Sequence, residues 1–292
     1  MIIISATAVS AEFKAIKGGK TLKTRIISGV VAAIFVAVIL FVNSFYSLVG
    51  IVALSLLAAV ATFEILNNTG CVKNRGAVIC AMVYSAVMLF IYSGIFITHT
   101  TLTVIYVFVM VGFIVFDHKN FGDRQITMVL SMPTLISFAF CCLESLINNY
   151  DGAGLLYFFL VFNFACISDI FAYFVGSAVG KHKLAPEISP KKTIEGAVGG
   201  LLGSILGTAV ICLIFAAALN KEINILALLI ATPFFSAIGM LGDLFASAIK
   251  RSFGIKDYGN IMPGHGGVLD RLDSVLLVSP ALALFLSFVS VI

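Results

Sequence analysis

The fold is decided by long apolar stretches such as AVGGLLGSILGTAVICLIFAAAL, residues 197–219. This stretch contains no charged residue, and as a helix rising about 1.5 Å per residue it is long enough to cross the roughly 30 Å hydrocarbon core of a bilayer. Of the 292 residues, 61% are hydrophobic and 11% are charged, whereas soluble domains carry roughly 25% charged residues. With a mean hydropathy of +1.13, a soluble fold is excluded.

Comparable stretches recur along the whole chain and predict an all-α integral membrane protein, a polytopic bundle of about nine transmembrane helices. No segment of soluble-domain composition separates them, so we expect one continuous membrane domain. It would consist of a cytoplasmic segment at 1–25, transmembrane helices at 26–150 and a catalytic transmembrane region at 151–292. The predicted spans cover roughly residues 27–43, 46–66, 76–97, 99–116, 126–147, 154–177, 197–219, 223–246 and 272–292.

The basic residues predict how the bundle is oriented. With nine spans, 17 of the 18 Lys and Arg residues fall in segments on one side, and only Lys221 falls on the other. Lys and Arg next to transmembrane helices tend to remain in the cytoplasm. We therefore expect a cytoplasmic N-terminus and an external C-terminus.

Polar residues with helical spacing mark the end of the eighth predicted span. Asp243, Ser247 and Lys250 are spaced i, i+4 and i+7, so they project from one face of a helix. An aspartate inside a membrane helix is costly to desolvate, which favours a functional role. The alternative is a structural pairing with a Lys or Arg on a neighbouring helix.

The next segment, KDYGNIMPGHGGVLDRLDS at 256–274, combines glycines with acids. Gly264, Gly266 and Gly267 would let the backbone approach an anion. Asp270 and Asp273 lie one helical turn apart, a spacing suited to Mg²⁺. A glycine-rich stretch alone would indicate only a flexible loop, but with these acids and Arg271 beside them it indicates a site for metal and phosphate.

A third polar segment, SPKKTIEG at 189–196, precedes the seventh predicted span. Its two lysines offer positive charges to a polyphosphate, and Ser189 and Thr193 offer hydroxyl groups. A basic loop beside a membrane otherwise reflects topology alone. Upstream, Asp169, Tyr173, Gly176 and Gly180 also follow helical spacing.

Other residues carry weaker signals. Five glycines of the seventh span form a stripe that permits close helix packing. The six cysteines form no Cys-x-x-Cys pair, and we expect no disulfide framework and no thiolate metal site. Glu64 lies in an apolar run, where a functional role and a helix pairing are equally open, and the role of Asp257 is undecided.

Together these segments resemble a known family. The Ser-Pro-Lys-Lys-Thr-x-Glu-Gly segment and the residues from Asp169 to Gly176 are similar to the phosphatidate cytidylyltransferases, also called CDP-diacylglycerol synthases. The resemblance covers roughly the C-terminal 130 residues. Its longest part is the pattern Ser247-x-x-Lys250-Arg251-x4-Lys256-Asp257-x5-Pro263-x-His265-Gly266-Gly267-x-x-Asp270-Arg271-x-Asp273.

The resemblance implies a Mg²⁺-dependent nucleotidyltransferase of phospholipid biosynthesis, which transfers the cytidylyl group of CTP to phosphatidic acid and releases pyrophosphate. By position, Asp243 and Asp270 match the family's metal-binding acids; with Lys250 they are the expected catalytic residues. Asp169 and Asp273 are further candidate ligands for Mg²⁺ or for a second cation such as K⁺. The expected substrate-binding residues are Ser189, Lys191, Lys192, Thr193, Ser247, Arg251, Lys256, His265, Gly266, Gly267 and Arg271.

The expected partners are CTP, phosphatidic acid, the lipid bilayer and a second copy of the chain in a homodimer, without nucleic acid. The expected location is the plasma membrane, with the active site facing the cytoplasm. Two other functions remain open. A CTP-dependent lipid kinase would need the same metal and phosphate chemistry, with His265 as its base. A secondary transporter would use Asp169 and Asp243 as a cation or proton site.

Overall fold

The computed structural model describes residues 27–70, 72–91, 96–150, 152–261 and 266–292. Several predictions fall outside these residues: the cytoplasmic segment 1–25, the loop glycine Gly264 and the candidate base His265. The described chain is almost entirely helical, apart from one short hairpin. This confirms the all-α fold class.

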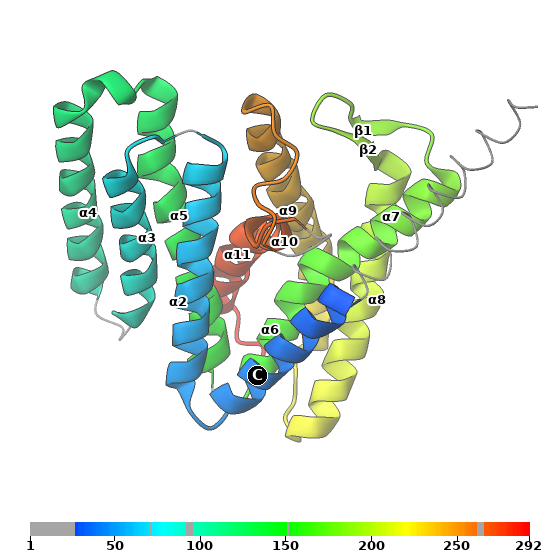
Figure 1. Ribbon diagram of the computed structural model, residues 1–292. Helices are drawn as coiled ribbons and strands as arrows, with labels where there is room; N and C mark the ends of the chain where they lie inside the picture. The colour runs from blue at the N-terminus through cyan, green and yellow to red at the C-terminus, as the bar shows by residue number, and fades with distance from the viewer. Residues whose placement is uncertain (1–26, 71, 92–95, 151, 262–265) are drawn as a thin grey trace, which may run out of the picture.

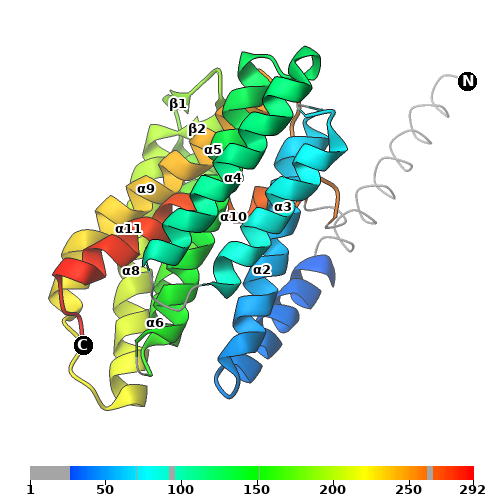
Figure 2. The same ribbon diagram turned by 90° about the vertical axis from the view of Figure 1, so that its left-hand side faces the viewer.

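The first half of the chain forms an apolar helix Ile27–Asn43 and four labelled helices. These are α2 (Ser47–Phe63), which continues as the π-helical turn η1 (Glu64–Asn68), α3 (Arg75–Phe90), α4 (Phe96–Phe116) and α5 (Asp123–Asn148). The short 3-10 turn η2 (His118–Asn120) joins α4 to α5. In Figures 1 and 2 these four helices stand side by side, with α2 against α3 and α5.

The second half begins with a long, continuous helical segment. This segment consists of α6 (Gly154–Phe162), the π-helical turn η3 (Asn163–Ile167) and α7 (Ser168–Val179). It is followed by the strands β1 (Lys183–Ala185) and β2 (Ser189–Thr193), and then by α8 (Ile194–Leu219), α9 (Ile225–Ser252), α10 (Leu269–Leu272) and α11 (Val275–Phe288).

Seven helices of the described chain are long and apolar enough to cross a membrane. Two shorter apolar helices, Ile27–Asn43 and Arg75–Phe90, coincide with the other two predicted spans. Many large apolar side chains point outward, among them Phe108 and Ile230, each 72% exposed. Such a surface is stable only against lipid. The chain is thus a polytopic membrane protein, while the count of nine crossings and the orientation stay predictions.

The hairpin of β1 and β2 was not predicted from the sequence. Its strands are antiparallel, with Lys183 opposite Thr193 and Ala185 opposite Ser189. In Figures 1 and 2 the hairpin lies at the same end of the molecule as the chain that follows α9. Pairing with β1 therefore fixes the backbone conformation of β2, which carries Lys191 and Lys192.

The glycines of α8 allow α7 and α8 to pack closely. A Cβ atom on Gly200 would lie 2.7 Å from the carbonyl oxygen of Ser168, and one on Gly196 would lie 2.6 Å from that of Ala172. Side chains at these positions would push the helices apart. The predicted small-residue stripe is confirmed, and it brings α7 against the start of α8, next to the hairpin.

Candidate functional site

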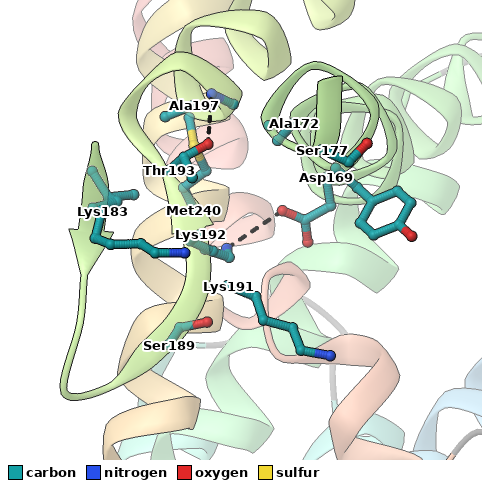
Figure 3. A pocket seen from close by; sticks show the side chains of 14 residues that line it. Asp169, Ala172, Ser177, Lys183, Ser189, Lys191, Lys192, Thr193, Ala197 and Met240 are labelled. Atoms are coloured by element: carbon teal, nitrogen blue, oxygen red, sulfur yellow. Dashed lines mark hydrogen bonds and ion pairs between the residues drawn. The ribbon is translucent and has the colours of Figure 1, made fainter. Parts of the chain in front are cut away.

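Lys192, near the end of β2, connects the hairpin to α7 and α9 through ion pairs. Its Nζ atom lies 2.6 Å from Oδ2 of Asp243 on α9. It also lies 3.5 Å from Oδ1 of Asp169 on α7 (Figure 3). Burial lowers the pKa of Lys192, but the two carboxylates outweigh this effect and hold the pKa above its usual value. Lys192 is therefore a fixed positive charge.

Lys250 forms a second ion-paired cluster with acids of the α10 region. Its Nζ atom lies 2.9 Å from Oδ1 of Asp270 and 3.9 Å from Oδ2 of Asp273. The other oxygen of Asp270 accepts hydrogen bonds from the backbone N–H groups of Tyr258 at 2.8 Å and Gly267 at 3.0 Å. Both oxygens of Asp270 are thus engaged in holding the loop that follows α9.

The two clusters are neighbours because α9 carries a member of each. Asp243 pairs with Lys192, and Lys250, further along the same helix, pairs with Asp270. The Ser247 hydroxyl donates a hydrogen bond to Oδ1 of Asp243 at 3.4 Å, which agrees with the prediction that the two residues share a helix face. The carboxyl groups of Asp243 and Asp273 also lie close enough to influence each other electrostatically. The result is a continuous charged band of Asp169, Lys192, Asp243, Asp273, Lys250 and Asp270.

A cavity of about 440 Å³ opens beside this band, between α7, the hairpin and α8. Asp169 and Lys192 form part of its wall, together with Ser189 and Thr193 (Figure 3). Lys183 and Lys191 also line it. Three lysines against one aspartate favour an anionic ligand, and the hydroxyl groups can donate hydrogen bonds to it.

The described residues contain no group of three His, Cys, Asp or Glu side chains close enough to hold a metal ion alone. Each acid of the charged band pairs with a lysine, but four aspartates share two lysines, which leaves the band with a formal charge of −2. Mg²⁺, however, is commonly bound through one or two carboxylates together with substrate phosphates. Asp169 and Asp243 supply carboxylate oxygens of this kind, and Asp169 lines the cavity, so the residues fit a cation that arrives with a phosphorylated substrate.

Other predicted site residues lie outside the charged band. Arg251 donates from Nε to the carbonyl oxygen of Ile188 at 3.4 Å and from Nη1 to that of Ile255 at 3.3 Å, so it ties the hairpin to the end of α9. Lys256, Asp257 and Arg271 are exposed. Gly266 has a φ of +89°, a backbone conformation that favours glycine.

Sequence reasoning left the role of Glu64 open, and the structure brings this residue to the site. Its Oε1 accepts a hydrogen bond from the N–H of Val268 at 3.0 Å and its Oε2 accepts one from the N–H of Leu269 at 2.8 Å. The side chain is fully buried. A lone acid in an apolar run was the only signal in the sequence, and it did not indicate a partner some 200 residues away.

Comparison with known proteins relates the chain to one family. The model of the cytidylyltransferase family matches residues 23–289, which include the charged band, the cavity and Glu64. The chain is 47% identical over 148 residues to the phosphatidate cytidylyltransferase of Bacillus subtilis, an alignment that covers 49% of this chain and 52% of that protein.

Two further relatives carry the same name. The phosphatidate cytidylyltransferase of Staphylococcus haemolyticus is 39% identical over 180 residues, covering 61% of this chain and 66% of that protein. That of Staphylococcus aureus strain COL is 37% identical over 179 residues, covering 61% and 67%. The chain thus spans from about half to two thirds of the length of the curated relatives it matches.

Proposed function

The chain belongs to the cytidylyltransferase family, and from that premise we propose that it is a phosphatidate cytidylyltransferase. It transfers the cytidylyl group of CTP to phosphatidic acid and yields CDP-diacylglycerol and pyrophosphate. One observation carries this proposal: Lys192 is clamped between Asp169 and Asp243 in the wall of a cavity that two further lysines line. The relatives' names supply the two substrates.

The reaction needs charge neutralisation more than it needs a strong base. A phosphate oxygen of phosphatidic acid attacks the α-phosphorus of CTP, and the bond from that phosphorus to the bridging oxygen breaks as pyrophosphate leaves. A phosphate monoester has a second pKa of about 6, so the nucleophile is already anionic at neutral pH. Catalysis then depends on holding two polyanions together.

The lysines of the cavity suit this task. Lys183 and Lys191 line it and present positive charge to phosphate oxygens. Lys192 is held by two carboxylates from different helices, so its charge does not have to be ordered when substrate binds. Lys250 is held in the same way by Asp270 and Asp273. The fixed charges would stabilise the charge that develops on the leaving pyrophosphate.

Nucleotidyltransferases of this kind generally depend on a divalent cation. We propose Mg²⁺, held by Asp243 and Asp169 together with phosphate oxygens of CTP, with Asp273 as a candidate ligand of a second cation such as K⁺. When bound, Mg²⁺ would withdraw negative charge from the phosphates. Asp270 remains a candidate ligand by its family position. Like Asp243, it already engages both oxygens in hydrogen bonds or ion pairs within the protein.

The membrane setting fits a lipid substrate. Bacterial relatives point to the plasma membrane, and CTP is a cytoplasmic metabolite, so we propose that the cavity faces the cytoplasm. The hairpin that forms its wall follows the sixth predicted span, on the side where 17 of 18 basic residues are expected. A homodimer stays a prediction.

Product analysis tests the proposal. Purified protein is incubated with CTP labelled in the cytosine ring, phosphatidic acid and Mg²⁺, with and without a chelator. We expect a labelled lipid and pyrophosphate, both dependent on the cation. In a parallel incubation with a polyprenol in place of phosphatidic acid, CDP together with a phosphorylated polyprenol would identify a lipid kinase instead. Solute counterflow without consumption of CTP would identify a transporter.

A further inference from the structure

Glu64 is the acid that connects the N-terminal helices to the active-site loop. It ends the regular part of α2 and begins the π-helical turn η1. π-Helical turns are rare and occur often at functional sites. With 0% of its surface exposed and both oxygens accepting backbone N–H groups, Glu64 is a fully buried and fully paired carboxylate.

The two N–H groups that Glu64 binds are the first ones of the helix that carries Asp270 and Asp273. Val268 is the N-cap residue of α10, Leu269 is its first residue, and the Val268 side chain makes no capping hydrogen bond. The first N–H groups of a helix lack partners within the helix, and a carboxylate near them is favourable. The carboxylate of Glu64 thus caps the start of α10 from another helix.

Two glycines make room for this carboxylate. A Cβ atom on Gly267 would lie 2.5 Å from Oε2 and 2.6 Å from Oε1 of Glu64, and one on Gly259 would also collide with the carboxyl group. Real Cβ atoms essentially never approach so closely. Both glycines belong to the segment 256–274, so part of its glycine content serves to admit Glu64 rather than a ligand.

The position of Glu64 is transmitted to the charged band through short links. Gly267 donates its N–H to Asp270, which also binds the N–H of Tyr258 and pairs with Lys250. Asp273 lies one helical turn beyond Asp270 and is the second carboxylate near Lys250. Moving the start of α10 would therefore move both acids relative to Lys250.

We propose that Glu64 is a positioning residue of the active site, which fixes the start of α10 and thereby places Asp270, Asp273 and Lys250 for the reaction. This inference rests on the proposed function for its kinetic consequences. Glu64 touches no substrate and acts only through the loop. Its role explains why a lone acid stands in the apolar sequence of the N-terminal half.

The test compares Glu64→Gln with Glu144→Gln in the full-length protein in nanodiscs. Glu144 is a matched control, since it is also a buried carboxyl on a helix of the N-terminal half, and it accepts a hydrogen bond from Asn148 at 2.9 Å. Glutamine keeps the shape of Glu64 but places an NH₂ group against one of the two N–H donors. Hydrogen exchange and steady-state kinetics are measured for both variants.

For Glu64→Gln we expect faster exchange confined to peptides that cover 256–272, because local opening requires breaking only the bonds of this segment. The value of kcat should fall about 10- to 100-fold, as for a misplacement of catalytic groups, and the half-activating Mg²⁺ concentration should rise. Glu144→Gln should change neither measurement. Unchanged exchange in 256–272, or a kcat within twofold of the original, would overturn the proposal.

A second comparison covers the case in which Glu64→Gln loosens the whole protein. Gly267→Ala pushes a methyl group against Glu64, whereas in Glu64→Ala that space is empty. The double variant that combines Glu64→Ala with Gly267→Ala should therefore lose no more activity than the worse of the two single variants. Strictly additive losses would contradict a direct coupling between Glu64 and Gly267. If the original protein makes no CDP-lipid, the proposed function fails, and the exchange rates alone still decide the role of Glu64.

Discussion

The ammonium group of Lys250 lies 2.9 Å from Oδ1 of Asp270, and both side chains are nearly inaccessible, at 10% and 4% exposed. Lys250 stands near the end of α9, and Asp270 is the second residue of α10. Their ion pair thus closes the loop between these helices. Removing one partner of a buried pair leaves the other charge without compensation, which makes such a pair sensitive to substitution.

Asp270→Asn is expected to destabilise the loop as well as reduce activity. The amide keeps one acceptor but loses the charge that Lys250 requires, and its NH₂ group faces either the Lys250 ammonium group or both backbone donors, which share Oδ2. Breaking a buried pair costs about 3–5 kcal/mol. Thermal unfolding and cytidylyl transfer should both be affected. Asp123→Asn, at the exposed start of α5, is the control, and equal stability of the two variants would contradict this role of Asp270.

Asp243→Asn is expected to reduce transfer about 100-fold or more while the protein stays folded, because Lys192 keeps Asp169 as a partner. Asp169→Asn should have the smaller effect, since Asp169 lies 3.5 Å from the ammonium group and Asp243 lies 2.6 Å from it. The kcat values of both variants, measured at saturating CTP, check this order. Near-normal rates in Asp243→Asn would refute its catalytic assignment.

Lys192 should remain charged throughout the neutral and moderately alkaline range. Asp169 and Asp243 raise its pKa in the folded protein against the effect of burial. The stabilising charge is therefore complete below the usual lysine pKa of about 10.4 and is lost only as the pH rises through the higher folded value. We expect the original protein and Lys192→Arg to have kcat profiles of the same shape below about pH 10, because Lys192 does not titrate in that range. A loss centred near pH 8 that moves in this variant would disprove the prediction.

Removal of divalent cations should abolish transfer without unfolding the protein. In the described part of the chain each of the four acids of the site has Lys192 or Lys250 as a partner, so the contacts that hold these side chains in place do not include a metal. Activity and melting temperature are measured with a chelator and after Mg²⁺ is restored. A large fall in melting temperature would instead indicate a structural metal.

Thr193 should stabilise the junction of the hairpin and α8. Its hydroxyl accepts a hydrogen bond from the N–H of Gly196 at 3.1 Å, as an N-cap of α8. Thr193→Val keeps the shape and removes this bond, at a cost of about 1 kcal/mol, and should shift the neighbouring Lys192. Thr193→Ser should behave normally in thermal unfolding and in KM for CTP. Identical behaviour of Val and Ser would show that the cap is unimportant.

The fold class and the local geometry within helices could be predicted from the amino-acid pattern alone. Apolar stretches require helices in lipid, because every buried backbone group must be hydrogen-bonded. The i, i+4 spacing correctly predicted that Ser247 and Asp243 share a face, since helical periodicity alone fixes this relation. A pairing of Asp243 with a Lys or Arg on a neighbouring helix stood open as an alternative to function. The structure pairs Asp243 with Lys192, which lies on the hairpin and not on a helix.

Contacts between residues far apart in the sequence could not be predicted, because they depend on how the helices pack. The choice of Asp243 and Asp169 for Lys192 depends on how closely α7 packs on α8 and on the hairpin that turns Lys192 inward. The contact of Glu64 with Val268 and Leu269 depends on how α2 packs beside the loop. Periodicity specifies the face of one helix, whereas the partner of a buried charge is set by the packing between helices.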